Sequence, residues 1–167
     1  MTTEPSTTRD TATATPGPAG RVRELGHVVL YVRDLERALA FYRDLLGWPV
    51  VARPEGFPAA MFSAGRTHHD LLLIEVGPQA QPIPTGRRVG LYHLGVKVGD
   101  HDDDLRAVLG RLRDRPGLAT VVGTADHGFT HSLYVHDPDG NELELYVDVP
   151  GVERDAAAFA PPRPLLL

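Results

Sequence analysis

The chain has 167 residues, of which 42% are hydrophobic, and a net charge of −5 with acidic and basic residues interspersed. This size fits one folded domain, and the lack of a basic cluster argues against a nucleic-acid partner. There is no cysteine, which excludes disulfides and thiolate metal sites. No apolar run approaches the roughly 20 residues of a membrane helix, and residues 1–20 lack the apolar core of a secretory signal. We therefore expect a cytoplasmic protein with no membrane partner.

The first half of the chain predicts a strand, a helix and three further strands. Residues 1–20 are rich in Thr, Ala, Pro and Gly and predict a disordered tail. Residues 26–32 are β-branched and aromatic, which is typical of a strand. Apolar residues then recur at helical spacing from Leu35 to Leu46, and Gly47 follows where a helix would end. Three short strands are predicted over residues 48–53, 59–64 and 69–76.

The second half repeats this order after a proline-bearing linker at residues 77–90. The repeat is predicted to hold a strand at 91–98, a helix capped by Asp100 and ended by Pro116-Gly117, and strands at 118–123, 131–136 and 141–149. The chain is therefore predicted to contain two βαβββ modules, an α+β fold. Module one would span 21–76 and module two 91–149 within a domain of 21–149, followed by a C-terminal tail at 150–167.

Three residues that can bind a metal occupy matching places in the two modules. His27 stands in the first strand of module one, His93 in the first strand of module two, and Glu144 in the last strand. Any one of these histidines alone would more often be a hydrogen-bonded core residue, and a lone strand carboxylate is usually solvated. Together, two imidazoles and one carboxylate leave three octahedral positions open, the arrangement of non-haem Fe(II) oxygenases.

The turn before the last strand controls where Glu144 points. Asp137-Pro-Asp-Gly contains the residue types of a tight turn. In the strand that follows, side chains alternate between two faces, so a slip of one residue would replace Glu144 with Leu143 or Leu145. The turn is therefore predicted to fix the register that the metal site requires.

The chain resembles the vicinal oxygen chelate superfamily, which holds glyoxalase I, type I extradiol dioxygenases and bleomycin-resistance proteins. The resemblance is carried by residues 26–42 with Leu46-Gly47, by residues 92–96 and by residues 137–145. It implies that the two modules form a curved, barrel-like mixed sheet around a metal. It also implies that His27, His93 and Glu144 are the metal ligands and that no further cofactor is needed.

Among these families, the second set of polar residues is most similar to that of extradiol dioxygenases. That resemblance implies that His69 acts as acid and base, that Tyr134 hydrogen-bonds a catecholate oxygen, and that His127 binds a substrate oxygen. His131 competes with His127 for the last role. The expected function is Fe(II)-dependent extradiol cleavage of a catechol-type aromatic diol by O₂, with Mn(II) as a second possible metal, in a homodimer.

Two other functions remain open from the sequence. Glyoxalase I uses four protein ligands and Ni(II) or Zn(II), and Glu75 follows His27 at nearly the spacing at which Glu144 follows His93. Strand alternation places His69 and Glu75 on one face, so it does not decide which of them approaches the metal. The third function is non-catalytic binding of a small-molecule drug, which the presence of all three metal ligands disfavours.

Overall fold

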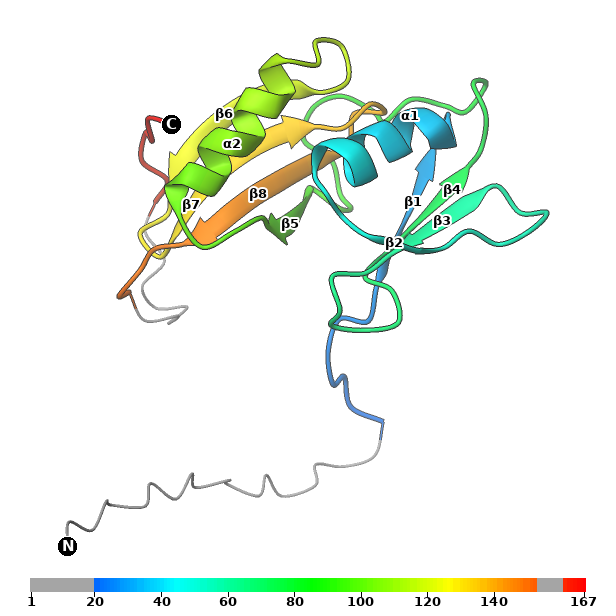
Figure 1. Ribbon diagram of the computed structural model, residues 1–167, viewed down its shortest axis with the longest axis horizontal. Coiled ribbons are helices and arrows are strands. Elements are labelled where there is room, and N and C mark those ends of the chain that lie inside the picture. The colour runs from blue at the N-terminus through cyan, green and yellow to red at the C-terminus, as the bar shows by residue number, and fades with distance from the viewer. Residues whose placement is uncertain (1–19, 153–160) are drawn as a thin grey trace, which may run out of the picture.

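The computed structural model describes residues 20–152 and 161–167 and contains the two βαβββ modules in the predicted order (Figure 1). All but the last residue of the predicted N-terminal tail lies outside the described residues. The first module consists of β1 (Val28–Val32), α1 (Leu35–Leu39), the π-helical η1 (Ala40–Leu45), β2 (Val50–Ala52), β3 (Ala59–Phe62) and β4 (Leu71–Glu75). The second consists of β5 (His93–Lys97), α2 (Asp102–Arg113), β6 (Thr120–Asp126), β7 (Thr130–His136) and β8 (Glu142–Asp148).

Each module builds one four-stranded mixed sheet. The strand orders are β1-β4-β3-β2 and β5-β8-β7-β6, and in both sheets the first strand of the module pairs in parallel with the last. The α+β class is thus confirmed. The two sheets are not joined into a closed barrel, and β1 and β5 are both edge strands in the described part of the chain.

The two helices lie side by side and cover one side of the sheets (Figure 1). The helix predicted after residue 34 begins as predicted, because the Asp34 side chain accepts a hydrogen bond from the amide of Arg37 at 2.8 Å. Its second half widens into a π-helix that ends before Gly47, whose φ of 75° suits glycine. The predicted cap of α2 at Asp100 is wrong. His101 occupies the N-cap position, and the Asp104 carboxylate reaches back to the amides of Asp100 and His101 at 2.9 and 3.1 Å.

One hydrophobic core, which extends through both modules, fills the space between helices and sheets. The strand alternation predicted for β8 is confirmed: Leu143, Leu145 and Val147 are buried on the helix side, and Glu144 lies on the other side. We call the sides of the two sheets that face away from the helices open face A, in module one, and open face B, in module two.

The C-terminal residues 161–167 dock on β6. Asp126 and Arg163 exchange two backbone hydrogen bonds of 2.9 Å, and the Thr124 hydroxyl donates to the carbonyl of Leu165 at 2.6 Å. Leu167 packs against the core. Of the helices that the structure describes, none is both long and apolar enough to span a bilayer.

Candidate metal and substrate site

Strand register places three of the predicted site residues, one on each of β5, β7 and β8, on open face B. Glu144 of β8 pairs with Gly95 of β5 on one side and with Tyr134 of β7 on the other. His93 pairs with Glu142, two residues earlier along the same ladder. Because paired residues of neighbouring strands point to the same face, the side chains of His93, Glu144 and Tyr134 converge. The predicted proximity of these three residues follows directly from β-sheet geometry.

Glu144 is the centre of a cluster of polar contacts. Its Oε2 lies 3.1 Å from His93 Nε2, and its Oε1 accepts a hydrogen bond of 2.6 Å from the Ser132 hydroxyl. His127 Nε2 lies 3.6 Å from the same Oε1 and 2.8 Å from the hydroxyl oxygen of Tyr134. The carboxylate is therefore held on both oxygens while its side chain keeps 18% of its surface accessible.

Ser132 was missed by sequence reasoning. It is fully buried and orients Glu144, yet a serine in a strand has no distinctive signature. The available signal was its position two residues before Tyr134, which strand alternation assigns to the same face. Its contact with Glu144 required the β7–β8 register, which sequence alone does not determine.

The site favours a protonated tyrosine. Burial, followed by the negative charge of Glu144, raises the pKa of Tyr134 well above its ordinary value. The hydroxyl of Tyr134 therefore keeps its proton at neutral pH and can donate a hydrogen bond. A similar effect of the Glu142 carboxylate raises the pKa of Tyr92, which lies next to His93 with ring centroids 4.6 Å apart.

His127 and His131 lie on opposite sides of the second sheet. His131 Nδ1 is 2.7 Å from a carboxylate oxygen of Asp102, at the start of α2, and its Nε2 is 3.8 Å from Asp126. His131 is thus directed towards the helix, because its β7 position has the opposite parity to Tyr134. Of the two candidates, His127 is the histidine beside Glu144.

His27 and His69 lie together but apart from Glu144. The ring of His27 is 4.3 Å from that of His69, and His69 Nδ1 contacts His68 Nδ1 at 2.6 Å. Burial, with smaller contributions from the His27 and His68 rings, lowers the pKa of His69. His27 precedes β1 and lines a cavity of about 640 Å³ together with Gly95 and Lys97 of β5.

The predicted triad is therefore only partly assembled. Within residues 20–152 and 161–167, no group of three or more His, Asp or Glu side chains is close enough to hold a metal ion. His93 and Glu144 form one half of the predicted ligand set, and His27 with its neighbours forms the other half on module one.

Glu75 lies on the helix side of its sheet and caps α1. It pairs with the buried Val32, and its Oε2 accepts a hydrogen bond from the amide of Leu35 at 2.8 Å. The register between β1 and β4 also shows which residue of module one corresponds to Glu144 of module two. Glu144 pairs with the residue two after His93, and the residue two after His27 pairs with Leu72. The expectation that Glu75 matches Glu144 is thus wrong in this structure, because spacing along the chain does not determine how β4 pairs with β1.

His69 and Glu75 do not share a face either. β4 begins at Leu71, so His69 lies in the preceding turn, where strand alternation does not apply. Its ring turns towards His27, whereas Glu75 is bonded to the start of α1.

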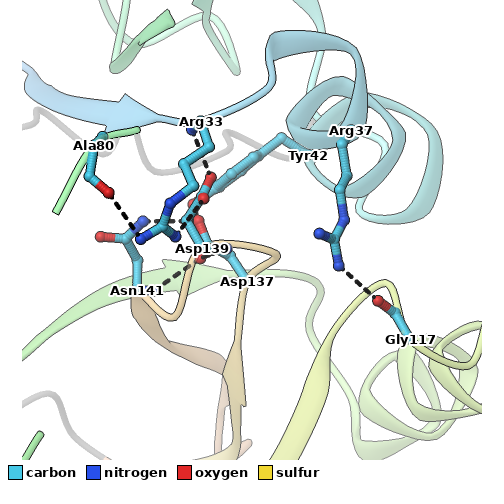
Figure 2. A network of polar contacts seen from close by, with 8 residues as sticks. All are labelled: Arg33, Arg37, Tyr42, Ala80, Gly117, Asp137, Asp139 and Asn141. Atoms are coloured by element: carbon cyan, nitrogen blue, oxygen red, sulfur yellow. Dashed lines mark hydrogen bonds and ion pairs between the residues drawn. The ribbon is translucent and has the colours of Figure 1, made fainter. Parts of the chain in front are cut away.

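The turn before β8 is fixed by module one (Figure 2). The Tyr42 hydroxyl donates to Asp137 Oδ2 at 2.8 Å, while Asp137 Oδ1 accepts from the amides of Asp139 and Asn141 at 2.9 and 2.8 Å. Arg33 contacts the Asp139 carboxylate through its own amide at 3.2 Å and its guanidinium at 3.3 Å. The predicted role of this turn in setting the β8 register therefore has a physical basis that spans both modules.

The donor atoms present suit a hard or borderline divalent metal. Imidazole nitrogen and carboxylate oxygen are ligands for Fe(II) and Mn(II), and there is no thiolate to favour a softer ion. The Nδ1 atom of His93 and the Nε2 atom of His69 are buried and lack hydrogen-bond partners among the described residues. Such unsatisfied nitrogens are unusual in a folded protein and are consistent with sites that gain a partner when a ligand binds.

The paired βαβββ architecture is shared with solved structures. A glyoxalase/dioxygenase from Nostoc punctiforme aligns with a TM-score of 0.62 over 83% of this chain and 99% of that one, at 18% identity. At this identity the likeness concerns the fold alone. A model of the Glyoxalase/Bleomycin resistance protein/Dioxygenase superfamily matches residues 24–145, and the chain belongs to this superfamily.

Curated relatives in this superfamily have different activities. The chain is 35% identical to a catechol-2,3-dioxygenase of Bacillus subtilis over 75% of its own length and 42% of the relative's. It is 31% identical to a lactoylglutathione lyase of Neisseria meningitidis over 71% of its own length and 86% of the relative's. The chain thus spans less than half of the dioxygenase but most of the lyase, so the comparisons define the superfamily and not the reaction.

Proposed function

We propose that this protein is an Fe(II)-dependent extradiol dioxygenase that cleaves a catechol-type aromatic diol. The observation that carries the proposal is the cluster of His93, Glu144, His127 and Tyr134 on and beside open face B. The similarity to a catechol-2,3-dioxygenase supports it. The ligands in this proposal are His93, Glu144 and His27, and Mn(II) would suit the same donors.

The remaining residues would handle the substrate and its protons. A bound Fe(II) ion would supply a centre that takes the two diol oxygens and O₂. The Tyr134 hydroxyl would donate a hydrogen bond to a diol oxygen. His127, already 2.8 Å from the Tyr134 oxygen, would accept the proton that the diol releases on binding and return it to the product. His69, beside His27, would serve as a second acid–base group.

In module one, the position of β4 that corresponds to Glu144 of β8 holds no carboxylate, which disfavours a lyase. A four-ligand site needs a second acid, and Leu72 stands at that position while Glu75 is bonded to the start of α1.

The test is metal binding by Glu144→Gln, with Glu75→Gln as the matched control. We expect Glu144→Gln to lose iron and Glu75→Gln to keep it. Iron loss in Glu75→Gln, together with turnover of a hemithioacetal, would favour the lyase.

We further propose that two copies of the chain combine to complete each site. Contacts on the helix side tie the two modules of one chain together: Arg111 donates to the carbonyl of Leu45 at 2.8 Å and Arg37 to that of Gly117 at 2.9 Å. These ties leave open face A uncovered, with Tyr31 68% exposed. Such an exposed apolar face favours a partner, and a second copy would bring His27 to the Glu144 of the first.

Mixing two inactive variants tests the shared site. His27→Ala and Glu144→Ala each remove a ligand, but a mixed dimer would contain one site with both ligands intact. If sites are shared, an equal mixture should regain about a quarter of the wild-type activity after random exchange of subunits. A mixture that stays inactive, although exchange is shown by tagged chains, would place the complete site within one chain.

A further inference from the structure

A second cavity, of about 920 Å³, lies between the linker and open face B. Its walls include Ile83, Arg87 and Arg88 of the linker, together with Tyr92 and Glu142. It adjoins the candidate site, because Glu142 Oε1 lies 3.8 Å from His93 Nδ1 and the rings of Tyr92 and His93 are 4.6 Å apart. A substrate held at His93 would therefore have room to extend into this cavity.

The acidic residues of this cavity have partners. Asp139 forms an ion pair with Arg33 at 3.3 Å, and Glu142 Oε2 lies 3.4 Å from His136 Nε2. The negative charge of Glu142 also raises the pKa of Tyr92. The negative charges that line the cavity are thus already balanced or hydrogen-bonded.

Arg87 and Arg88, unlike the acidic residues of the cavity, have no partner in the described structure that balances their charge. Arg88 donates to the carbonyl of Pro84 at 3.0 Å, a contact that leaves its charge uncompensated. Arg87 has no hydrogen bond or ion pair with any other residue in the two described ranges. Both guanidinium groups are exposed at the cavity, and arginine binds carboxylates through two parallel hydrogen bonds.

The remaining surface of the cavity is largely apolar. Leu91 and Tyr92 are 55% and 72% exposed, and Ile83 is half-buried beside them. An apolar wall with a few charged groups at one place is the usual composition of a small-molecule site. The complementary ligand has an apolar body and an anionic end.

We propose that this cavity binds a carboxylate-bearing substituent of the aromatic substrate, with Arg87 and Arg88 pairing with the carboxylate. The inference rests on the proposed function for the nature of the ring, but the charge selectivity belongs to the cavity itself. The substrate class is thereby narrowed from catechols in general to catechols that carry an acidic side chain.

Binding of two probes that lack the diol tests the cavity without iron or O₂. The probes are 3-phenylpropanoate and its neutral analogue 3-phenylpropanamide, measured by calorimetry on the wild type, Arg87→Gln/Arg88→Gln and the control Arg106→Gln. Arg106 is paired with Asp103 on α2, away from the cavity. We expect the wild type and the control to bind the carboxylate about tenfold more tightly than the amide, and the double variant to lose this preference.

Equal affinity of the wild type for the two probes, or no binding of either, would overturn the proposal. So would a preference that survives in a folded double variant, checked by circular dichroism. Ring cleavage is then measured separately with 3-(2,3-dihydroxyphenyl)propanoate and its amide. A carboxylate preference in binding without any ring cleavage would refute the proposed function and leave the cavity assignment standing. Cleavage of both diols without a binding preference would refute the cavity assignment and leave the proposed function standing.

Discussion

The hydrogen bond between Tyr42 and Asp137 joins the helix of module one to the turn that positions Glu144. Both residues are buried, with 0% and 4% of their surface exposed. Tyr42→Phe removes only the hydroxyl, so the cavity it leaves is small. Net values for hydrogen bonds to charged groups are about 1.5–3 kcal/mol. In the variant, Asp137 keeps its contacts with Asp139 and Asn141. We therefore expect the free energy of unfolding to fall by an amount at the lower end of this range, about 1.5 kcal/mol.

The measurements are urea unfolding, for the free energy, and thermal unfolding, for Tm, both at neutral pH; Tyr31→Phe is the control because Tyr31 is 68% exposed. The loss of about 1.5 kcal/mol should lower Tm by roughly 3–6 °C, whereas the control should stay within about 0.5 kcal/mol of the wild type. A double-mutant cycle with Asp137→Asn should show coupling between the two positions. A Tyr42→Phe variant as stable as Tyr31→Phe would refute the reasoning.

The pH dependence of this loss has a defined sign. Burial raises the pKa of Asp137, and the Tyr42 hydroxyl acts in the opposite direction by stabilising the carboxylate. In Tyr42→Phe the pKa of Asp137 should therefore rise further above its unfolded value. Because a carboxyl group with a raised pKa makes folding more favourable as it is protonated, the deficit of the variant should shrink as the pH falls through that raised pKa. A deficit that grows with acidity would contradict the assigned direction.

Three further predictions concern single elements of the fold and site. His127→Asn should lower kcat/KM by about 100-fold or more with unchanged iron content. His131→Asn should keep its activity and lose about 0.5–1 kcal/mol of stability. The opposite pattern would show that His131, and not His127, acts on the substrate. Deleting residues 161–167 should lower Tm, measured by calorimetry, because β6 and the core lose their docked partner; an unchanged Tm would show that the docking contributes nothing. Backbone hydrogen bonds from Asp100 and His101 lower the pKa of Asp104. The wild type should therefore be more stable than Asp104→Asn at neutral pH, and this difference should vanish as the pH falls through the lowered pKa. A difference in stability that persists in acid would refute this origin.

The repeat and its faces were predictable because they depend on local periodicity. The alternation of apolar and polar residues in β8 was enough to place Glu144 opposite the helices. The β5 pattern did the same for His93, and the two faces meet because β5 and β8 are neighbours in the sheet. Motif order along the chain carried the superfamily assignment.

Features that depend on register or on three-dimensional proximity were not predictable in this way. Glu75 follows His27 at nearly the spacing at which Glu144 follows His93, but the register between β1 and β4 gives the matching position to Leu72. The choice between His127 and His131 also depended on contacts, since only the folded chain brings Asp102 to His131. Likewise, the distance of His27 from Glu144 arises from how the modules pack, which no local pattern describes.

Oxygen uptake by the iron-loaded protein in the presence of a catechol tests the central claim most directly. The account predicts consumption of one O₂ per diol with formation of a yellow ring-cleavage product, and loss of both in Glu144→Gln. No oxygen uptake by the iron-loaded wild type, combined with conversion of a hemithioacetal by the nickel-loaded protein, would contradict it.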